Sequence, residues 1–405
     1  MKYIVFLGDG MADYPVPELD GKTPLMVARK PGIDWIAQHG RTGLFQTIGP
    51  EMLTGSAIAN LSVLGYDPTA IFHGSEGRGV LEAASLGIEL SDSDLALRVN
   101  LICVEEGKIR SHSSGHISNP EAHSLIHDLD RHLAHLGMKL YPGLSYRHVL
   151  VVPRGSEAVE CAPPHDHVGE LFSSLMVQPR EASARNSAEL LNRLILESQA
   201  FLAHHPINEK RGASGKQAAN SLWPWAPGKR PQMQTFQERF GIRGAVITAV
   251  DLVKGIAIYA GMDPISVEGA TGLYNTNYEG KADACLKALE THDFVYVHVE
   301  AADEAGHERD LRLKIRCIED LDARLIQRVM AALKTSNDEV VLAVLPDHPT
   351  PVAHGCHTRE AVPVAIFSPA AAADSVSCFD EESVRAGSLG LMRGSTFIET
   401  VFGRI

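Results

Sequence analysis

Short apolar segments alternate with longer amphipathic ones along most of the chain. Five runs are almost wholly apolar and predict buried strands, at residues 2–7, 245–250, 294–300, 340–346 and 362–368. Helical patterns lie between the later runs, at residues 251–260, 279–291 and 311–334. Because strands that alternate with helices form βαβ units, the pattern predicts an α/β fold with a mostly parallel sheet flanked by helices.

The middle of the chain has a different pattern. Short strands are expected at 96–104 and 148–153, and one helix near 119–137, which predicts a smaller α+β cap inserted into the main fold. A chain of 405 residues is long enough for two domains. We expect a core formed by residues 1–84 and 180–405 and an inserted cap at 85–179. The stretch 205–235 is rich in Gly, Pro, Lys and Trp and is expected to be a long loop that returns to the core.

Composition narrows the class of function. The formal net charge of −13 argues against a nucleic-acid binder, but local arginines could still bind a small anionic substrate. The six cysteines form no CxxC pair, which favours reduced thiols in a cytoplasmic protein over a disulfide scaffold. The first apolar run is too short for a signal peptide, and no segment approaches the roughly 20 apolar residues of a membrane span. We therefore expect a cytoplasmic protein without nucleic-acid or membrane partners.

Polar clusters follow directly on three of the predicted strands. These clusters are LGDG, HVEAADEAGH and LPDHPTP, and they contain Asp9, Asp303 with His307, and Asp347 with His348. In an open α/β sheet, ligands bind at the carboxyl ends of the strands. The clusters are therefore expected to form one site.

Each of these pairs also has a simpler interpretation. Asp303 and His307 are four residues apart, so a helix would place them on one face, although an Asp that caps the helix and a surface His would give the same spacing. Asp347 and His348 could both face a site at a strand end, or form an ordinary polar turn. His357 follows ten residues after Asp347 and is a candidate for the same pocket, with nearby His354 as the alternative.

A serine completes the set. Ser56 follows Gly55 at the start of a predicted helix, where free backbone N–H groups and the helix dipole favour a phosphorylated side chain; a plain N-cap serine is the alternative. Carboxylate and imidazole ligands suit Mn²⁺, Zn²⁺ or Mg²⁺. Two such ions would activate a hydroxyl and stabilise the entering and leaving oxygens of a displacement at phosphorus. The residues therefore predict a two-metal enzyme of phosphate-ester chemistry.

These residues and their surroundings resemble a known family. The chain is similar over nearly its whole length to the archaeal-type cofactor-independent, or 2,3-bisphosphoglycerate-independent, phosphoglycerate mutases of the alkaline phosphatase superfamily. The matching segments include GDGMAD (8–13), GSAIANLSVLGYDP (55–68), GRGVLEAASLGIEL (77–90), SSGHIS (113–118), APGKRP (226–231), AVDLVKGI (249–256), TNYEGKADACLKAL (276–289), DEAGH (303–307) and DHPTP (347–351).

The resemblance implies an alkaline-phosphatase-like core and a glycolytic isomerase that interconverts 3-phosphoglycerate and 2-phosphoglycerate. It divides the ligands between two ions, of which manganese is preferred. Asp303, His307 and His357 would hold one ion. Asp9, Asp347, His348 and Ser56 would hold the other, and Ser56 would carry the phosphoryl group between the two transfers.

The resemblance also implies that the cap binds the substrate. Arginine suits the joint recognition of carboxylate and phosphate groups, and His116 is a candidate acid/base or phosphate-positioning residue. For each basic candidate the alternative is a solvated surface side chain. The candidates for substrate binding are Arg78, Arg98, Arg147, Lys229, Arg230 and Lys254.

Three positions depart from the family pattern. Ala57 replaces an acidic residue after the serine, Gly355 replaces a basic residue before the last histidine, and Glu360-Ala361 replaces an Asp-Pro pair. Such changes beside the ligands could mark another substrate, so a phosphatase, a phosphonate hydrolase or a homoserine kinase on the same site are alternatives, as is a metal-binding protein without mutase activity. The sequence has neither a Walker A loop nor a kinase glycine-rich loop, which counts against the kinase.

Overall fold

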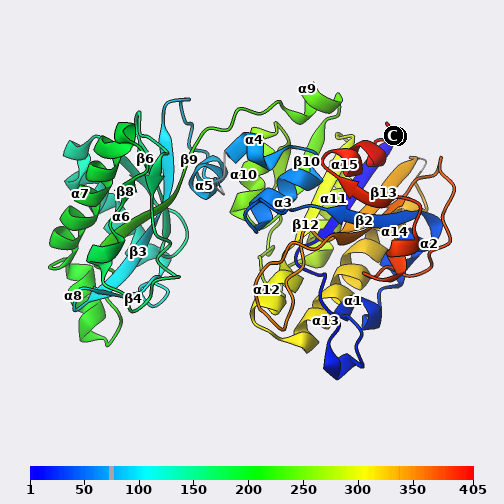
Figure 1. The fold of residues 1–405 in the computed structure, drawn as a ribbon, viewed down its shortest axis with the longest axis horizontal. Helices are drawn as coiled ribbons and strands as arrows, with labels where there is room; N and C mark the ends of the chain where they lie inside the picture. Colours follow the sequence, from blue (N-terminus) through cyan, green and yellow to red (C-terminus); the bar gives the residue numbers. More distant parts are fainter. Residues whose placement is uncertain (73–76, 337) are drawn as a thin grey trace. The chain divides into compact units, whose positions relative to one another are not determined.

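A computed structural model describes residues 1–72, 77–336 and 338–405, and the chain divides into two compact units (Figure 1). The core unit comprises Met1–Gly74 and Gln232–Ile405, and the inserted unit comprises Ser75–Pro231. Within the described ranges, no helix is long and apolar enough to span a membrane.

The core unit is built on an eight-stranded sheet. Its order is β11-β10-β12-β1-β13-β14-β2-β15. The first five strands in this order, from β11 through β1 to β13, are parallel to one another. Strand β14 is antiparallel to both of its neighbours, β13 and β2. The strands are β1 (Lys2–Gly8), β2 (Arg41–Gln46), β10 (Gly244–Ile247), β11 (Asp263–Ile265), β12 (Phe294–Val299), β13 (Val340–Leu345), β14 (Val362–Phe367) and β15 (Gly390–Arg393). The predicted α/β class with a mostly parallel sheet is confirmed.

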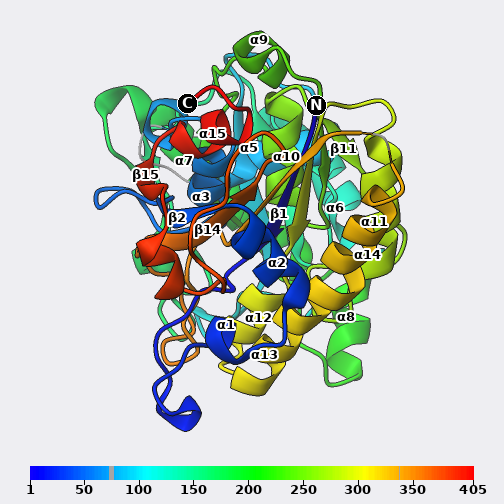
Figure 2. The ribbon, with the colours of Figure 1, turned by 90° about the vertical axis from the view of Figure 1, so that its right-hand side faces the viewer.

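Helices cover both faces of this sheet, as Figures 1 and 2 show. On one face, side chains of α2, α11, α13 and α14 form a single apolar core with Ile4 and Phe6 of β1. On the other face lies α3, whose Asn60 accepts a hydrogen bond from Tyr296 of β12. The helices are α1 (Pro24–Val27), α2 (Pro31–His39), α3 (Ser56–Val63), α4 (Pro68–Phe72), α9 (Phe236–Phe240), α10 (Asp251–Tyr259), α11 (Tyr278–Ala288), α12 (Ala301–His307), α13 (Leu311–Asp320), α14 (Gln327–Leu333) and α15 (Thr396–Val401).

The predicted helix at 311–334 is interrupted. A π-helical turn at Leu321–Ile326 joins α13 to α14. Within this turn, the buried Asp322 carboxylate accepts hydrogen bonds from the backbone N–H groups of Gly32 and Ile33 at the start of α2. The carboxylate of this π-helical turn therefore binds backbone N–H groups that have no partner within α2 itself.

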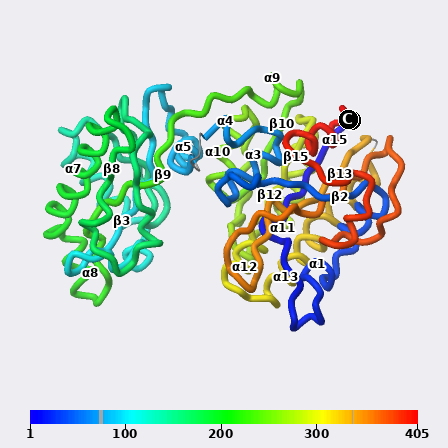
Figure 3. Tube along the Cα trace, in the orientation of Figure 1, coloured from blue at the N-terminus to red at the C-terminus, as the bar shows by residue number. Residues whose placement is uncertain are grey.

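The central strands bring the predicted strand-end residues together. In β1, Ile4 to Leu7 are fully buried because both faces of the strand are covered, which explains the continuous apolar run in the sequence. β1 lies between β12 and β13, with Gly8 opposite Val299 and Leu7 opposite Leu345. Figure 3 shows this blue strand beside the yellow and orange segments. The residues that follow the three strands therefore share one edge of the sheet.

The inserted unit has an antiparallel sheet of order β4-β3-β6-β5, with β9 also paired to β3. One face packs against α6 and α7 in an apolar core that includes Leu97, Val99 and Leu150. The elements are α5 (Arg78–Ser85), β3 (Leu95–Glu105), β4 (Lys108–Ser111), α6 (Asn119–His132), β5 (Lys139–Tyr141), β6 (Arg147–Val152), α7 (Arg185–Leu202), α8 (Pro206–Ala213) and β9 (Ser221–Lys229), with a small ribbon of β7 (Val159–Glu160) and β8 (Gln178–Pro179).

The stretch 205–235 corrects one expectation. It is not a long loop, because it contains α8 and the nine-residue strand β9. Pro224 and Pro227 argue against a strand in the sequence. Among the described residues, however, β9 pairs with β3 alone and is an edge strand, where prolines are tolerated. The observed boundaries of the inserted unit, 75 and 231, therefore differ from the expected 85 and 179, since β9 completes the sheet of that unit.

His148 gives the inserted unit a pH-dependent stability. Its ring is fully buried on β6, Nδ1 accepts a hydrogen bond from the Gly143 N–H at 3.1 Å, and Nε2 has no hydrogen-bond partner among the described residues. Burial, with the charges of His123 and Arg98, lowers the pKa of His148 to about 3. In an unfolded chain the pKa of a histidine is about 6.5. Protonation therefore favours the unfolded state, and stability is lost progressively as pH falls from about 6.5 towards 3.

We expect the His148→Gln variant to lose less stability on acidification than the wild type. Between pH 6.5 and 5 the difference should reach about 2 kcal/mol, because each pH unit contributes about 1.4 kcal/mol. This difference is measured from urea unfolding curves of the inserted unit, recorded at both pH values. Exposed His204 supplies the control variant His204→Gln, which should behave as the wild type. Equal pH dependence in His148→Gln and wild type contradicts the assignment.

Candidate active site

The strand-end residues of the core unit lie close together at the carboxyl edge of the sheet. Asp9 follows β1, Asp347 and His348 follow β13, and Asp303 lies in α12, which begins just after β12. All four side chains are buried. His307 and His357 are more exposed and border the same cluster.

Ser56 is the first residue of α3. Gly55 is the N-cap, and no side chain caps the helix, so Ser56 is not the capping residue that the simpler interpretation required. Its Oγ lies 3.2 Å from His348 Nε2. The backbone N–H groups of the first turn have no partners within the helix, so an anion on Ser56 would be stabilised there.

Asp9, Asp347 and His348 form one group of converging ligand atoms. His348 Nε2 is 3.4 Å from Asp347 Oδ2 and 3.6 Å from Asp9 Oδ1. Burial and the carboxylates of Asp347 and Asp303 raise the pKa of Asp9 well above its usual range, and burial lowers the pKa of His348. Crowded carboxylates beside a neutral imidazole are the electrostatic setting that a cation would relieve.

Asp303, His307 and His357 converge beside this group. Asp303 Oδ2 is 3.2 Å from His307 Nε2, Asp303 Oδ1 is 3.4 Å from His357 Nε2, and the two Nε2 atoms are 3.0 Å apart. Burial disfavours the Asp303 carboxylate, but hydrogen bonds from His307 and His357 outweigh it and lower its pKa well below the usual range. Asp303 and His357 also group with His348, whose ring stacks on that of His357 at 3.9 Å.

The donor atoms of both groups fit metal ions. Asp9 Oδ1 is buried without a hydrogen-bond partner among the described residues. His307 Nδ1 lies 3.0 Å from the Gly355 carbonyl and must carry the proton of that hydrogen bond, so a metal ion would bind at Nε2 in place of its proton. His354 is not part of either group, since its ring packs edge-on against Tyr14 at 5.5 Å.

A buried amide that the sequence analysis missed connects the helix of Ser56 to a ligand. Asn60 Nδ2 donates to Asp347 Oδ2 at 2.9 Å and to the Ser56 carbonyl at 2.8 Å, and Asn60 Oδ1 accepts from the Tyr296 hydroxyl at 2.6 Å. A polar residue among the apolar positions of IANLSVL was the signal for it. Asn60 fixes the orientation of Asp347 relative to Ser56.

We expect Asn60→Ala to weaken Mn²⁺ binding by about 10- to 100-fold, as losses behind a ligand commonly do. Asp347 Oδ2 would lose its amide donor, and the carboxylate could rotate. Titration of chelator-treated protein with Mn²⁺ measures the affinity. Tyr296→Phe is the matched control, because it removes the other bond of Asn60 and leaves Asp347 held, so its loss should be smaller. Wild-type affinity in Asn60→Ala would show that the amide does not orient the ligand.

Three more groups that the sequence analysis missed lie behind or beside Asp9, and two of them, His298 and Lys281, are buried. His298 Nε2 is 3.0 Å from Asp9 Oδ2, and Lys281 Nζ donates to the His298 carbonyl at 2.8 Å. Glu300 groups with Asp9 and Asp303. Burial, with the charges of Asp303 and Glu304, raises the pKa of Glu300 to about 8, and burial lowers the pKa of Lys281 to about 8. His298 and Glu300 could have been noticed in the sequence, because these polar residues stand at and just after the end of an apolar strand. Lys281 has no such signal in the sequence.

The inserted unit carries a basic and aromatic cluster on β3, β6 and β9. Arg98 is 5% exposed, its guanidinium lies 5.0 Å above the Trp225 ring, and Arg78 lies 6.0 Å from the same ring. Arg147 is near enough to Arg98 that the two charges repel. Arg98 pairs with Glu82 at 3.2 Å, while its buried Nε has no hydrogen-bond partner among the described residues. A buried donor on one arginine, with two more arginines beside it, is suited to an anion.

Imidazole rings extend this cluster. His116 and His112 both contact the Tyr146 ring edge-on, at 6.0 and 5.7 Å. His165, which was not predicted, lies 5.1 Å from the Trp225 ring. His116 is exposed and has a positive φ of 53°, which is uncommon for a residue other than glycine. The cluster therefore joins three predicted arginines, His116 and two further histidines.

The remaining basic candidates lie elsewhere. Lys229 ends β9 and is half-buried, and Arg230 follows it and is exposed. Lys254 is half-buried on α10 of the core unit. The part of these three residues in substrate binding stays a prediction.

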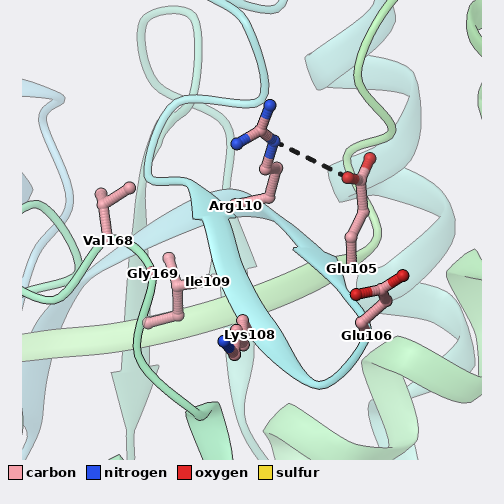
Figure 4. A pocket seen from close by; sticks show the side chains of 7 residues that line it. All are labelled: Glu105, Glu106, Lys108, Ile109, Arg110, Val168 and Gly169. Atoms are coloured by element: carbon pink, nitrogen blue, oxygen red, sulfur yellow. Dashed lines mark ion pairs between the residues drawn. The ribbon is translucent and has the colours of Figure 1, made fainter.

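A surface hollow in the inserted unit is separate from these clusters. It lies at the β3–β4 hairpin, where Figure 4 shows Arg110 paired with Glu105 at 3.8 Å beside Lys108 and Gly169. None of the predicted site residues lines it. Its mixed charges do not favour the phosphate and carboxylate groups that the arginine cluster suits.

The three positions that depart from the family pattern fit the structure around them. Ala57 is buried in α3. Gly355 has a φ of +66°, and a Cβ there would lie 2.8 Å from Arg309 Nε, so this turn favours glycine. Glu360 accepts a hydrogen bond from the Tyr14 hydroxyl at 2.7 Å. The departures therefore leave the converging ligand atoms in place.

Comparisons with known proteins agree with this geometry. A family model described as 2,3-bisphosphoglycerate-independent phosphoglycerate mutase matches residues 37–208. The mutase of that description from Methanosarcina acetivorans is 48% identical over 401 residues, which cover 98% of each chain, and a probable one from Geobacter sulfurreducens is 45% identical over the whole of both chains. The cofactor-independent phosphoglycerate mutase of Thermoplasma acidophilum is 27% identical with a TM-score of 0.70, covering 100% of this chain and 99% of that one.

A solved Pyrococcus horikoshii protein is similar over 100% of this chain and 98% of its own, with 30% identity and a TM-score of 0.83. The fold and the converging Asp and His residues define an α/β enzyme with a candidate metal centre. The chain belongs to the 2,3-bisphosphoglycerate-independent phosphoglycerate mutases. The family and the enzyme class predicted from the sequence are confirmed, and homology gives the chain phosphoglycerate mutase activity.

Proposed function

We propose that the enzyme interconverts 3-phosphoglycerate and 2-phosphoglycerate through a phosphoserine at Ser56. The observation that carries this proposal is the position of the Ser56 hydroxyl, at the first residue of α3 and 3.2 Å from His348 in the Asp and His cluster. The activity of the family supplies the substrate class, and the cluster supplies the chemistry.

Two divalent ions, Mn²⁺ in preference to Zn²⁺ or Mg²⁺, would occupy the cluster. Asp303, His307 and His357 would hold one, and Asp9, Asp347, His348 and Ser56 would hold the other. When bound, such ions lower the pKa of a hydroxyl ligand and neutralise charge on the transferring phosphoryl group. The buried Asp9 Oδ1, which has no hydrogen-bond partner in the described part of the chain, supports this proposal.

Ser56 would perform two transfers that balance each other. In the first, its Oγ forms a bond to phosphorus as the bond to the 3-oxygen of the substrate breaks, and the serine proton replaces the phosphoryl group on glycerate. In the second, the 2-hydroxyl of the same glycerate takes the phosphoryl group and the proton returns to Ser56. His116 is the candidate to handle these protons or to position the phosphate. The reaction consumes no water and needs no free 2,3-bisphosphoglycerate.

The arginine cluster of the inserted unit would bind the anionic groups of the substrate. Arg98, Arg78 and Arg147 present several N–H donors, and guanidinium groups bind carboxylate and phosphate through paired hydrogen bonds. The repulsion among these cations, which together with burial lowers the pKa of Arg98, would be relieved by a bound anion. Lys229, Arg230 and Lys254 are further candidates for this role.

One set of assays tests the proposal. Purified protein with Mn²⁺ and 3-phosphoglycerate, without 2,3-bisphosphoglycerate, should produce 2-phosphoglycerate and no inorganic phosphate. Release of phosphate alone would indicate a phosphatase, and release from a phosphonate would indicate a phosphonate hydrolase. ATP-dependent phosphorylation of homoserine would indicate a kinase. Bound metal with no turnover in any assay would indicate a metal-binding protein and overturn the proposal.

A further inference from the structure

A fully buried lysine lies behind the metal-ligand loops. Lys314 belongs to α13, and its side chain is 0% exposed. Its Nζ donates to three oxygens, namely Asp13 Oδ2 at 2.7 Å, the Thr350 carbonyl at 2.8 Å and the Ala12 carbonyl at 3.0 Å. An ammonium group has three N–H donors, so each has one acceptor here.

The three acceptors come from two loops. Ala12 and Asp13 are on the loop after β1, four residues or fewer beyond Asp9, and Thr350 is on the loop after β13, beyond Asp347 and His348. The loops also contact each other directly. The Val352 N–H donates to Asp13 Oδ2 at 3.2 Å, and Met11 forms a bridge with Pro349. Lys314 therefore joins the two segments that carry the ligands of one proposed ion.

The same network reaches the second ligand group. The Thr350 hydroxyl, on the residue whose carbonyl Lys314 holds, donates to Asp303 Oδ1 and lies 3.3 Å from His348 Nδ1. The backbone N–H of Asp13 donates a hydrogen bond to Glu381 Oε1 at 3.0 Å, which holds the first loop from its other side. A shift of Thr350 would therefore move the donor that orients Asp303.

We propose that Lys314 is a positioning residue that holds the loops after β1 and β13 in the metal-binding arrangement before metal arrives. Desolvation makes a buried ammonium costly, and its full set of hydrogen bonds offsets that cost. Without it, two carbonyls and a carboxylate would each lose one hydrogen-bond donor, which would weaken the contact between the loops. A purely structural lysine would affect stability and leave metal affinity unchanged. The inference rests on the proposed metal site.

The test compares three variants. Lys314→Met removes the ammonium group with little change in volume. Asp13→Asn with Lys314→Met removes both charges, so no uncompensated carboxylate remains buried. Lys30→Met is the matched control, because Lys30 is 3% exposed in the same unit and pairs with Asp34 on α2, away from the ligand loops. For each protein, Mn²⁺ binding to chelator-treated samples is measured by calorimetry and the unfolding midpoint is measured in EDTA.

We expect Lys314→Met to bind Mn²⁺ about 10- to 100-fold more weakly, while Lys30→Met keeps wild-type affinity. The double variant should recover stability in EDTA but not the affinity. At saturating Mn²⁺, the KM of Lys314→Met for phosphoglycerate should stay unchanged. Wild-type Mn²⁺ affinity in Lys314→Met overturns the inference, and, if that variant does not fold, wild-type affinity in the double variant does so. If the wild type itself binds no Mn²⁺, the proposed metal site fails instead.

Discussion

Replacing Ser56 by alanine is expected to abolish phosphoryl transfer while the fold and the ligand groups persist. The side chain is half-buried, and its Oγ interacts with His348 Nε2 at 3.2 Å, so the substitution opens little space and breaks little structure. It removes the atom that must bond to phosphorus. Loss of a nucleophile commonly costs roughly 10⁴-fold or more in kcat. The change should therefore appear in turnover and leave the unfolding midpoint almost unmoved.

The measurement is the rate of 2-phosphoglycerate formation, with mass spectrometry of the quenched protein to detect phosphate on the peptide that contains residue 56. Ser62→Ala is the matched control, since Ser62 is on the same helix, is buried, and donates to the Ile58 carbonyl at 3.1 Å. It should keep its activity. Undiminished turnover in Ser56→Ala, or phosphate on another residue, would remove Ser56 from the mechanism.

Removing divalent metal is expected to abolish activity and to lower the stability of the core unit. Asp9, Asp347 and Asp303 bring buried carboxylates together, and burial with this crowding raises the pKa of Asp9. A bound cation would relieve the repulsion. A ligand at about 1,000 times its Kd stabilises a folded protein by about 4 kcal/mol. Both the unfolding midpoint and the activity should therefore fall in EDTA and return with Mn²⁺.

Thermal unfolding with EDTA, and then with Mn²⁺, Zn²⁺ or Mg²⁺ added back, measures this effect and ranks the metals. Asp322→Asn is the control, because Asp322 is a buried carboxylate of the same unit that accepts N–H groups of α2 and has no part in the ligand groups. It should be less stable than the wild type and show the same response to Mn²⁺. A wild-type midpoint that EDTA does not change would contradict a metal site at these residues.

The central strands could be predicted because they are covered on both faces. Continuous apolar runs such as KYIVFL then have one natural position, and the polar residues that follow them must lie at the sheet edge. β9 could not be predicted, since Pro224 and Pro227 argue against a strand unless it is known to be an edge. Which strand forms an edge depends on long-range pairing, which local sequence does not encode.

The ligand atoms were easier to predict than the groups that hold them. Asp303 and His307 have helical spacing after a strand, whereas Asn60 and Lys314 are single polar residues inside helical patterns. Lys314 does share a buried face with Cys317 and Ile318, at spacings of three and four residues. A charge on the apolar face of a helix is therefore a usable signal, although its partners 36 and 301 residues away are visible only in the fold.

The most direct test of the account is the location of metal in crystals of the Mn²⁺-loaded protein. Anomalous scattering should give two Mn²⁺ peaks, one among Asp303, His307 and His357, and one among Asp9, Asp347 and His348 beside the Ser56 hydroxyl. A single peak, or peaks away from these residues, would contradict a two-metal site at Ser56.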